Sequence, residues 1–313
     1  MAVIVITPSL TFVVLGALQD GVTVWDRATE LPGYLSDTFL HQRLGYAPSF
    51  QKSLRDVVLD GLPVDVALLV GGMVFGVAIG LATGLVSGAR RRTPVDRALS
   101  VGTALAMSAP VYWFGFIVLT FFAPQSGDLV QIPFLSWYGG YVPLREDPLR
   151  WLQSLWVPWL VLAAPLAAMC HRMTRASVAE ALDEDFIRTA RAKGVAEKRV
   201  MRRHALRAAL PPVVGLVSVN VALMVTNVVL IEPAFQLPGF FRMADIGQFR
   251  GEQSHVPSLE VVQALVIEAA VLIAVTMFLA ELVRAKIDPR AGSKRSSASM
   301  RAKTSRVVRT FSR

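Results

Sequence analysis

The chain contains several apolar runs long enough to cross a lipid bilayer, and this feature constrains its fold more than any other. A membrane-spanning helix needs roughly 20 mostly apolar residues, because backbone polar groups in lipid must be hydrogen-bonded within the segment itself. The sequence therefore predicts an all-α membrane protein with six transmembrane helices. The six runs, of which the first is the shortest, are 2–18, 64–86, 98–122, 151–170, 212–231 and 261–283.

Composition agrees with this interpretation. Of the 313 residues, 53% are hydrophobic, and the mean hydropathy is +0.49. The formal net charge of +9 does not indicate a nucleic-acid partner, because the basic residues lie between apolar runs rather than on a folded polar module. The single cysteine, Cys170, excludes an intrachain disulfide and a Cys-based metal cluster.

Small residues recur at a regular spacing in the second run. Gly72, Gly76, Gly80 and Gly84 are each four residues apart and therefore lie on one face of a helix. Such a ridge lets two helix backbones approach closely in lipid, so we expect a packing face there. Pro110 and Pro165 predict kinks in the third and fourth runs.

The distribution of Lys and Arg predicts the orientation in the membrane. The stretches 87–97, 172–207 and 284–313 hold four, ten and ten of the 32 basic residues, and the alternate loops hold the remaining eight. Since cytoplasmic loops carry the excess of Lys and Arg, both termini are expected in the cytoplasm.

The two ends of the chain need separate interpretations. The first run could be a secretory signal peptide, but it lacks a basic region before it and a convincing cleavage site, so we keep it as a helix. The stretch 291–313 is Ser, Lys and Arg with little to bury, which predicts a disordered basic cytoplasmic tail. Its charge suits the surface of membrane lipid, but a purely solvated tail is the interpretation that we favour.

The segment between the fourth and fifth runs is the most informative one. Ser177 and Glu180 have the spacing of a capping box, and Gly194 is placed to end the helix with a positive φ. The sequence thus predicts one amphipathic helix over 177–194. Such a helix beside a bilayer lies on lipid or docks into a partner's groove, and the residues alone leave both open. Its apolar stripe comprises Leu182, Phe186, Ile187 and Ala190.

Three stretches resemble a known family. Residues 185–194 read Asp-Phe-Ile-Arg-Thr-Ala-Arg-Ala-Lys-Gly, residues 203–207 read Arg-His-Ala-Leu-Arg, and residues 232–239 read Glu-Pro-Ala-Phe-Gln-Leu-Pro-Gly. Together they resemble the inner-membrane permeases of ABC importers, specifically the dipeptide, oligopeptide and nickel permease family. The resemblance implies a permease domain over 1–290 in a bacterial cytoplasmic membrane.

The resemblance also implies partners and residue roles. A second homologous permease subunit, two ATP-binding subunits and an extracytoplasmic solute-binding protein are expected. Peptides are the implied substrate, with nickel or another small solute as the alternative. The cytoplasmic segment becomes a coupling helix whose apolar stripe enters a cleft on the ATPase, with arginines at the rim. The implied coupling residues are Leu182, Asp185, Phe186, Arg188, Thr189, Ala190, Arg191 and Gly194.

Catalytic and cofactor motifs are missing from the sequence. We find no phosphate-binding Gly-x-x-x-x-Gly-Lys-Ser/Thr loop and no His-Glu-x-x-His, and the four histidines are scattered. We therefore expect no catalytic residue, no cofactor and no metal, with ATP hydrolysis on separate subunits.

Polar residues at membrane depth are candidates for the translocation path, although each can equally bond a neighbouring helix. Two other classes of protein stay open. A secondary transporter would need intramembrane ion sites and often inverted repeats, and no repeat is visible. A membrane-anchored docking protein would use 172–207 to bind a cytosolic partner. The path candidates are Asn220, Asn227 and Glu268.

Overall fold

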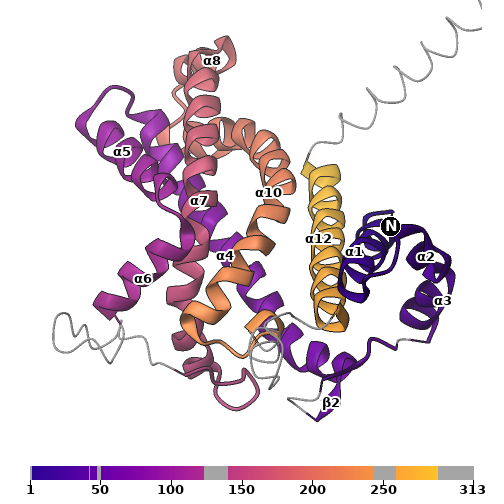
Figure 1. Cartoon of the computed structure of the whole chain (residues 1–313). Coiled ribbons are helices and arrows are strands. Elements are labelled where there is room, and N and C mark those ends of the chain that lie inside the picture. Colours follow the sequence, from indigo (N-terminus) through magenta and orange to yellow (C-terminus); the bar gives the residue numbers. More distant parts are fainter. Residues whose placement is uncertain (1, 42, 48–50, 123–139, 243–258, 288–313) are drawn as a thin grey trace, which may run out of the picture.

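The computed structural model describes residues 2–41, 43–47, 51–122, 140–242 and 259–287, and these residues are mostly helical (Figure 1). The predicted tail, 291–313, lies outside the described residues. The elements are α1 (Ala2–Asp20), α2 (Val24–Thr29), α3 (Leu31–Leu35), η1 (Ser36–Leu40), β1 (Tyr46–Ala47), β2 (Lys52–Ser53), α4 (Leu54–Ala89), α5 (Pro94–Ser108), α6 (Val111–Phe122), α7 (Pro148–Asp183), α8 (Asp185–Ala192), α9 (Glu197–Val200), η4 (Met201–Ala205), α10 (Leu206–Phe235) and α12 (Leu259–Ile287).

The apolar runs predicted as helices are helical. The first, second, fourth, fifth and sixth runs lie within α1, α4, α7, α10 and α12. Of these, α4, α7, α10 and α12 are long and apolar enough to cross a membrane, and α5 with α6 makes a fifth candidate if the pair counts as one span. In α1 the apolar part is shorter, Val5–Leu18. The structure therefore supports a multi-pass membrane protein with four or five evident spans.

The third run is not one kinked helix, and that expectation is wrong. It is divided into α5 and α6, which meet at an angle of 105°. Pro110 has no N–H to donate and disfavours the helical conformation at the residue before it. Ala109 accordingly has φ −88° and ψ 135°, which is extended backbone. The break therefore follows from the proline, and its angle lays α5 and α6 along different parts of α7.

The glycine ridge of α4 is a packing face, as predicted, and the helix that packs on it is α7. At Gly84, a Cβ would lie 2.8 Å from the carbonyl oxygen of His171 and 2.6 Å from the Cβ of Thr174. At Gly80, a Cβ would collide with Cys170. Since even a methyl group does not fit, the two backbones are in close contact over this stretch.

The apolar core lies where α4, α7 and α10 meet. Leu68, Leu162 and Ile231, one from each helix, are fully buried there. The indole Nε1 of Trp159 donates to the Ala67 carbonyl at 2.8 Å, which adds a polar link between α7 and α4. The fourth long helix, α12, contributes Leu272 to this core and packs between α10 and α1 (Figure 1). The core therefore holds all four long helices, and α1 extends it on one side.

Short elements connect α1 to α4 and were not predicted. They include α2, α3, η1 and a hairpin in which β1 and β2 pair antiparallel, with Tyr46 opposite Ser53 and Ala47 opposite Lys52. The two strands have two residues each, so the all-α prediction is correct apart from this hairpin. Such a short pair adds little stability of its own and depends on the helices around it.

Candidate functional site

The predicted single helix over 177–194 is two helices in the structure. The transmembrane helix α7 continues through Ser177 and ends at Asp183, and the backbone turns at Glu184, with φ −73° and ψ 147°, before α8 begins. The capping-box interpretation of Ser177 is therefore wrong, because that residue lies inside α7. Leu182 consequently belongs to α7 rather than to the separate helix that follows.

The end of α8 agrees with the prediction for Gly194. Its φ is +74°, in the left-handed region that favours glycine. The Gly194 N–H donates to the Arg191 carbonyl at 2.9 Å, and the Val195 N–H donates to the Ala190 carbonyl at 3.1 Å. These two bonds form a Schellman motif, which satisfies the last carbonyls of the helix. Thus α8 is a short, separately terminated helix beyond the end of α7 (Figure 1).

The apolar residues of α8 do not share one face. Ile187 is fully buried, whereas Phe186 is 48% exposed. The expected apolar stripe of Leu182, Phe186, Ile187 and Ala190 is therefore wrong, because the turn at Glu184 changes the direction of the chain after Leu182. Phe186 instead borders a surface hollow of about 550 Å³, whose other lining residues come from α7, Glu184 and α10 and include Ser177, Glu180 and Pro212.

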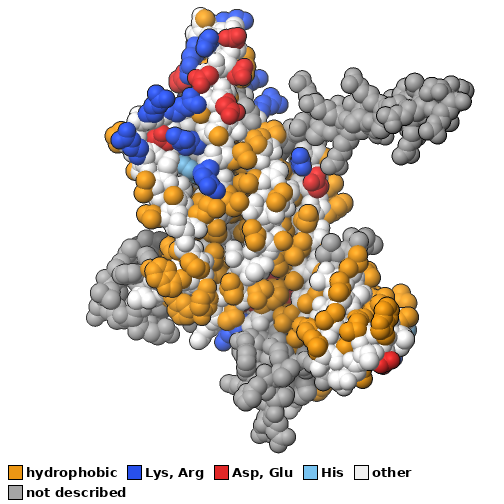
Figure 2. Space-filling view, turned by 45° about the horizontal axis from the view of Figure 1, so that its top comes forward, with side chains coloured by type: hydrophobic (Ala, Val, Ile, Leu, Met, Phe, Trp, Pro, Cys, Tyr) orange, Lys and Arg blue, Asp and Glu red, His pale blue; other side chains and the backbone are white. Residues whose placement is uncertain are grey.

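Charged side chains surround α8. Figure 2 shows Lys, Arg, Asp and Glu gathered at one end of the molecule, above a broad apolar surface. Arg191 donates two hydrogen bonds to Glu197, at 2.7 and 3.1 Å, and these bonds hold the pKa of the Glu197 carboxyl below its usual range. Arg188 is 3.4 Å from Asp185, and both are largely exposed. Both predicted rim arginines thus pair within the chain, Arg191 with Glu197 and Arg188 with Asp185, and Arg188 is the more exposed of the two.

A polar network near this end was missed from the sequence. Asp96, at the start of α5, is buried and accepts hydrogen bonds from Arg175 Nε at 2.7 Å and Nη2 at 2.9 Å. It also accepts from the Ser87 hydroxyl and the Arg92 N–H. The two hydrogen bonds between Arg175 and Asp96 fix α5 against α7, and the bond from Ser87 also connects α5 to α4. The sequence carried one local signal for Asp96, namely Thr93 three residues earlier, whose hydroxyl accepts a hydrogen bond from the Asp96 N–H. The partner Arg175 could not be predicted in this way, because it is far away in sequence.

The path candidates lie in different surroundings. Asn220 is buried and donates to the Leu216 carbonyl of its own helix at 2.8 Å, and Asn227 is partly buried. Glu268 is 4% exposed, and both of its carboxyl oxygens lack a hydrogen-bond partner among the described residues. No hydrogen bond among the described residues joins any two of these three side chains.

Glu268 instead belongs to a group of acidic side chains. Asp65 of α4 and Glu232 of α10 are fully buried, and a Cβ at Gly239 would collide with both of their carboxyl groups. The Phe240 N–H donates to Asp65 at 3.2 Å, and the Arg242 N–H donates to Glu232 at 3.1 Å. We call Asp65, Glu232 and Glu268 the carboxyl cluster. The hydrogen bonds of Asp65 and Glu232 tie the segment after α10 to α4 and to the end of α10, and Glu268 of α12 lies next to Asp65.

The sequence matches the family described as "Binding-protein-dependent transport system inner membrane component" over residues 52–293, which is more than half of the chain. The chain belongs to this family. Family membership agrees with the several long apolar helices of the structure.

Several curated relatives carry peptide transport names. The putative peptide transport system permease protein of Brucella abortus is 30% identical over 205 residues, covering 65% of this chain and 62% of that protein. The chain thus spans about three fifths of that relative's length. The dipeptide transport system permease protein of Bacillus subtilis is 27% identical over 309 residues, covering 92% of this chain and 94% of that protein.

Solved structures agree on the fold. A chain of a methionine ABC transporter in an inward-facing conformation aligns with a TM-score of 0.55 at 16% identity, covering 74% of this chain and 96% of that chain. At this identity the likeness establishes the fold alone. Over the aligned part, the helices of this chain are therefore arranged as in that chain.

Proposed function

We propose that this chain is the permease subunit of an ATP-driven peptide importer and that α8 couples it to the ATPase. The observation that carries the proposal is α8 itself, a separately terminated helix beyond a transmembrane helix, with an aromatic side chain exposed at the charged end of the molecule. Helices of this kind dock into grooves on partner proteins through a few anchor residues. The long apolar helices fit a membrane permease, and the charged end fits contact with a soluble subunit.

The proposed assembly contains a second homologous permease, two ATP-binding subunits and an extracytoplasmic solute-binding protein. Peptides are the substrate class favoured by the names of the curated relatives, which include peptide, dipeptide and oligopeptide permeases. Nickel has no comparable support. The chain crosses the bacterial cytoplasmic membrane six times in this proposal, with α1 and the α5–α6 pair as two of the spans and both termini inside.

The proposed roles within the coupling segment follow from exposure. Phe186 is the anchor, Arg188 and Asp185 are exposed contacts at its side, and Ala190 and Thr189 complete the surface of α8. Arg191 and Gly194 hold the shape of the segment, through the pair with Glu197 and through the Schellman motif. Leu182 supports it from α7. On the membrane side, Asn220, Asn227 and Glu268 are proposed to face the path once the second permease is present.

The test is a Phe186→Ala variant of the reconstituted complex. An aromatic anchor in a packed pocket commonly contributes a few kcal/mol to an interface, so substrate-stimulated ATP hydrolysis and uptake should both fall at least tenfold. Phe116→Ala is the matched control, because Phe116 is 46% exposed on α6, away from α8, and it should leave both activities unchanged. Wild-type activity in both assays for Phe186→Ala would mean that α8 is not the coupling element.

A further inference from the structure

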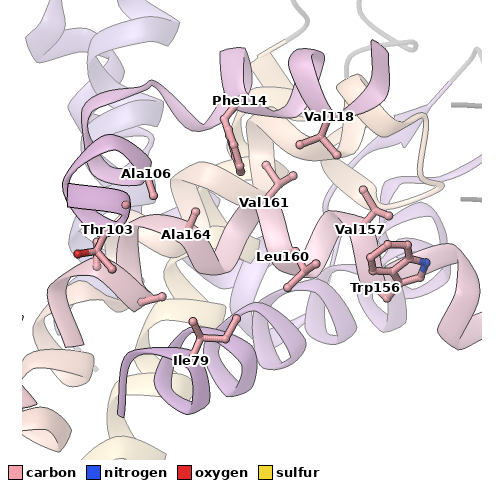
Figure 3. Close-up of a pocket in the computed structure, with 13 residues that line it drawn as sticks. Ile79, Thr103, Ala106, Phe114, Val118, Trp156, Val157, Leu160, Val161 and Ala164 are labelled. Carbon is pink, nitrogen blue, oxygen red and sulfur yellow. The ribbon is translucent and has the colours of Figure 1, made fainter. Parts of the chain in front are cut away.

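An apolar groove lies in the angle between α5 and α6, against the middle of α7 (Figure 3). Its volume is about 290 Å³, and its walls are almost entirely apolar. The Thr103 hydroxyl, which lies in the wall, donates to the Leu99 carbonyl of its own helix at 2.9 Å and is thereby satisfied. Thr103 and Ala106 come from α5, Phe114 and Val118 from α6, and Trp156 and Leu160 from α7.

The groove exists because the third apolar run is broken. The 105° bend between α5 and α6 leaves one flank of α7 without a helix covering it. Gly102 of α5 lines this space, and a Cβ there would meet no atom within 4 Å. In a bilayer such a groove is filled by hydrocarbon, because water in it would find too few hydrogen-bond partners.

The length of the groove suits a single lipid chain. Its wall on α7 extends from Trp156 to Ala168, which at the rise of an α-helix is about 18 Å. One leaflet of the hydrocarbon core is about 15 Å thick, half of the whole core. A chain that entered at one end would therefore run along α7 to about the middle of the bilayer.

A basic side chain, Arg172, lies at the end of the groove nearest the charged end of the molecule. Arg172 follows Ala168 by one helical turn and is exposed, and its Nη2 donates to the Met107 sulfur at 3.3 Å. Thioether sulfur is a weak acceptor, and no carboxylate among the described residues forms an ion pair with Arg172. Met107 is adjacent to Ala106 in the groove wall. The guanidinium is therefore available to a strong anionic acceptor such as a phosphate.

We propose that this groove binds one acyl chain of an anionic phospholipid from the cytoplasmic leaflet, with the phosphate of its headgroup on Arg172. The inference rests on the proposed orientation, which places Arg172 at the cytoplasmic surface, and it is independent of the transported substrate. Basic pockets between helices on this side of a membrane suit anionic headgroups.

The test uses the assembled complex in nanodiscs that contain phosphatidylglycerol with a photoreactive diazirine on its acyl chain. Label is expected on peptides that contain residues 102–106 and 156–168. Gly102→Leu should abolish that label by filling the groove, whereas Gly102→Ala should retain it. Gly215→Leu is the matched control, because a Cβ at Gly215 of α10 also meets nothing within 4 Å. Arg172→Gln should lower the labelling about fivefold, as the loss of one basic contact with an anionic lipid predicts.

Two results would overturn the proposal. Equal labelling by phosphatidylcholine and phosphatidylglycerol would show that the groove does not select an anionic headgroup. Label that Gly102→Leu does not remove would show that the groove is not the binding site. Neither labelling readout depends on uptake, so this test remains valid even if the transport proposal fails. An inverted orientation of the chain in the membrane would be detected separately by surface labelling.

Discussion

Gly194 ends α8 in a backbone conformation that a β-branched side chain strains. Its φ of +74° costs a non-glycine residue about 1–3 kcal/mol, and the shape of the α8 end depends on it. We expect Gly194→Val to insert normally but to lose most of its substrate-stimulated ATPase activity and uptake. Gly194→Asn is the control, because asparagine tolerates the left-handed region. Full uptake by Gly194→Val at matched membrane levels would show that transport does not need a glycine at the end of α8.

The carboxyl cluster permits a second prediction at the residue scale. Glu268 is buried beside Asp65 and Glu232, and none of the three forms an ion pair with a Lys or Arg in the described part of the chain. Glu268→Gln keeps the size of the side chain and removes one ionisable group, so the variant should be more stable by about 1–2 kcal/mol. The measurement is thermal unfolding at pH 8 in one detergent.

Glu281→Gln is the control for that measurement, because Glu281 is exposed on the same helix and its loss should leave the unfolding temperature unchanged. A lower unfolding temperature for Glu268→Gln would mean that the carboxylate has a favourable partner in the assembled protein.

The sequence predicted single residues unevenly. The φ of Gly194 is a local property, and the residues around it were enough to predict it. Asp65 lies inside the second apolar run, which marks it as unusual, but its proximity to Glu232 and Glu268 depends on three helices distant in sequence. The sequence placed Phe186 and Ile187 in one stripe, and the burial of Ile187 with the exposure of Phe186 depends on the turn at Glu184, where no glycine or proline signals a break.

At the scale of elements, the Asp96–Arg175 pair should hold α5 in place. The Asp96 side chain is 4% exposed, so Asp96→Asn leaves buried donors without a charged acceptor and should destabilise the protein by about 1–3 kcal/mol. Asp183→Asn is the matched control, since its pair with Arg91 is exposed and should contribute less than about 1 kcal/mol. Thermal unfolding of both variants checks this, and equal transitions would contradict the anchoring role.

Helix partners and helix breaks differ in how far the sequence determines them. The four-residue spacing of glycines in α4 predicted a packing face, and the structure places α7 on it. Pro110 predicted a disturbance in the third run, but the 105° angle depends on how α5 and α6 pack on α7. The boundary between α7 and α8 carries no such local signal, so a continuous helix to Gly194 was the natural prediction and was wrong.

At the scale of the whole molecule, orientation is the main prediction. Glu146 precedes α7 and Lys198 follows α8, and both are exposed. In intact cells, a membrane-impermeant maleimide should label Glu146→Cys and leave Lys198→Cys unlabelled until the cells are opened. The native Cys170 is fully buried and should stay unreactive. Labelling of Lys198→Cys in intact cells would reverse the proposed orientation.

The continuity of α7 has a mechanical consequence. This element is one helix of 36 residues, about 54 Å long, although Pro158 and Pro165 lie inside it, and α8 is attached to one end of it through the single extended residue Glu184. A tilt of only about 5° of a rod that long displaces its far end by about 5 Å. Because the glycines of α4 hold its backbone in direct contact with α7, α4 would have to tilt together with α7. A small displacement of α8 would therefore be transmitted to the opposite membrane surface as a joint movement of α4 and α7.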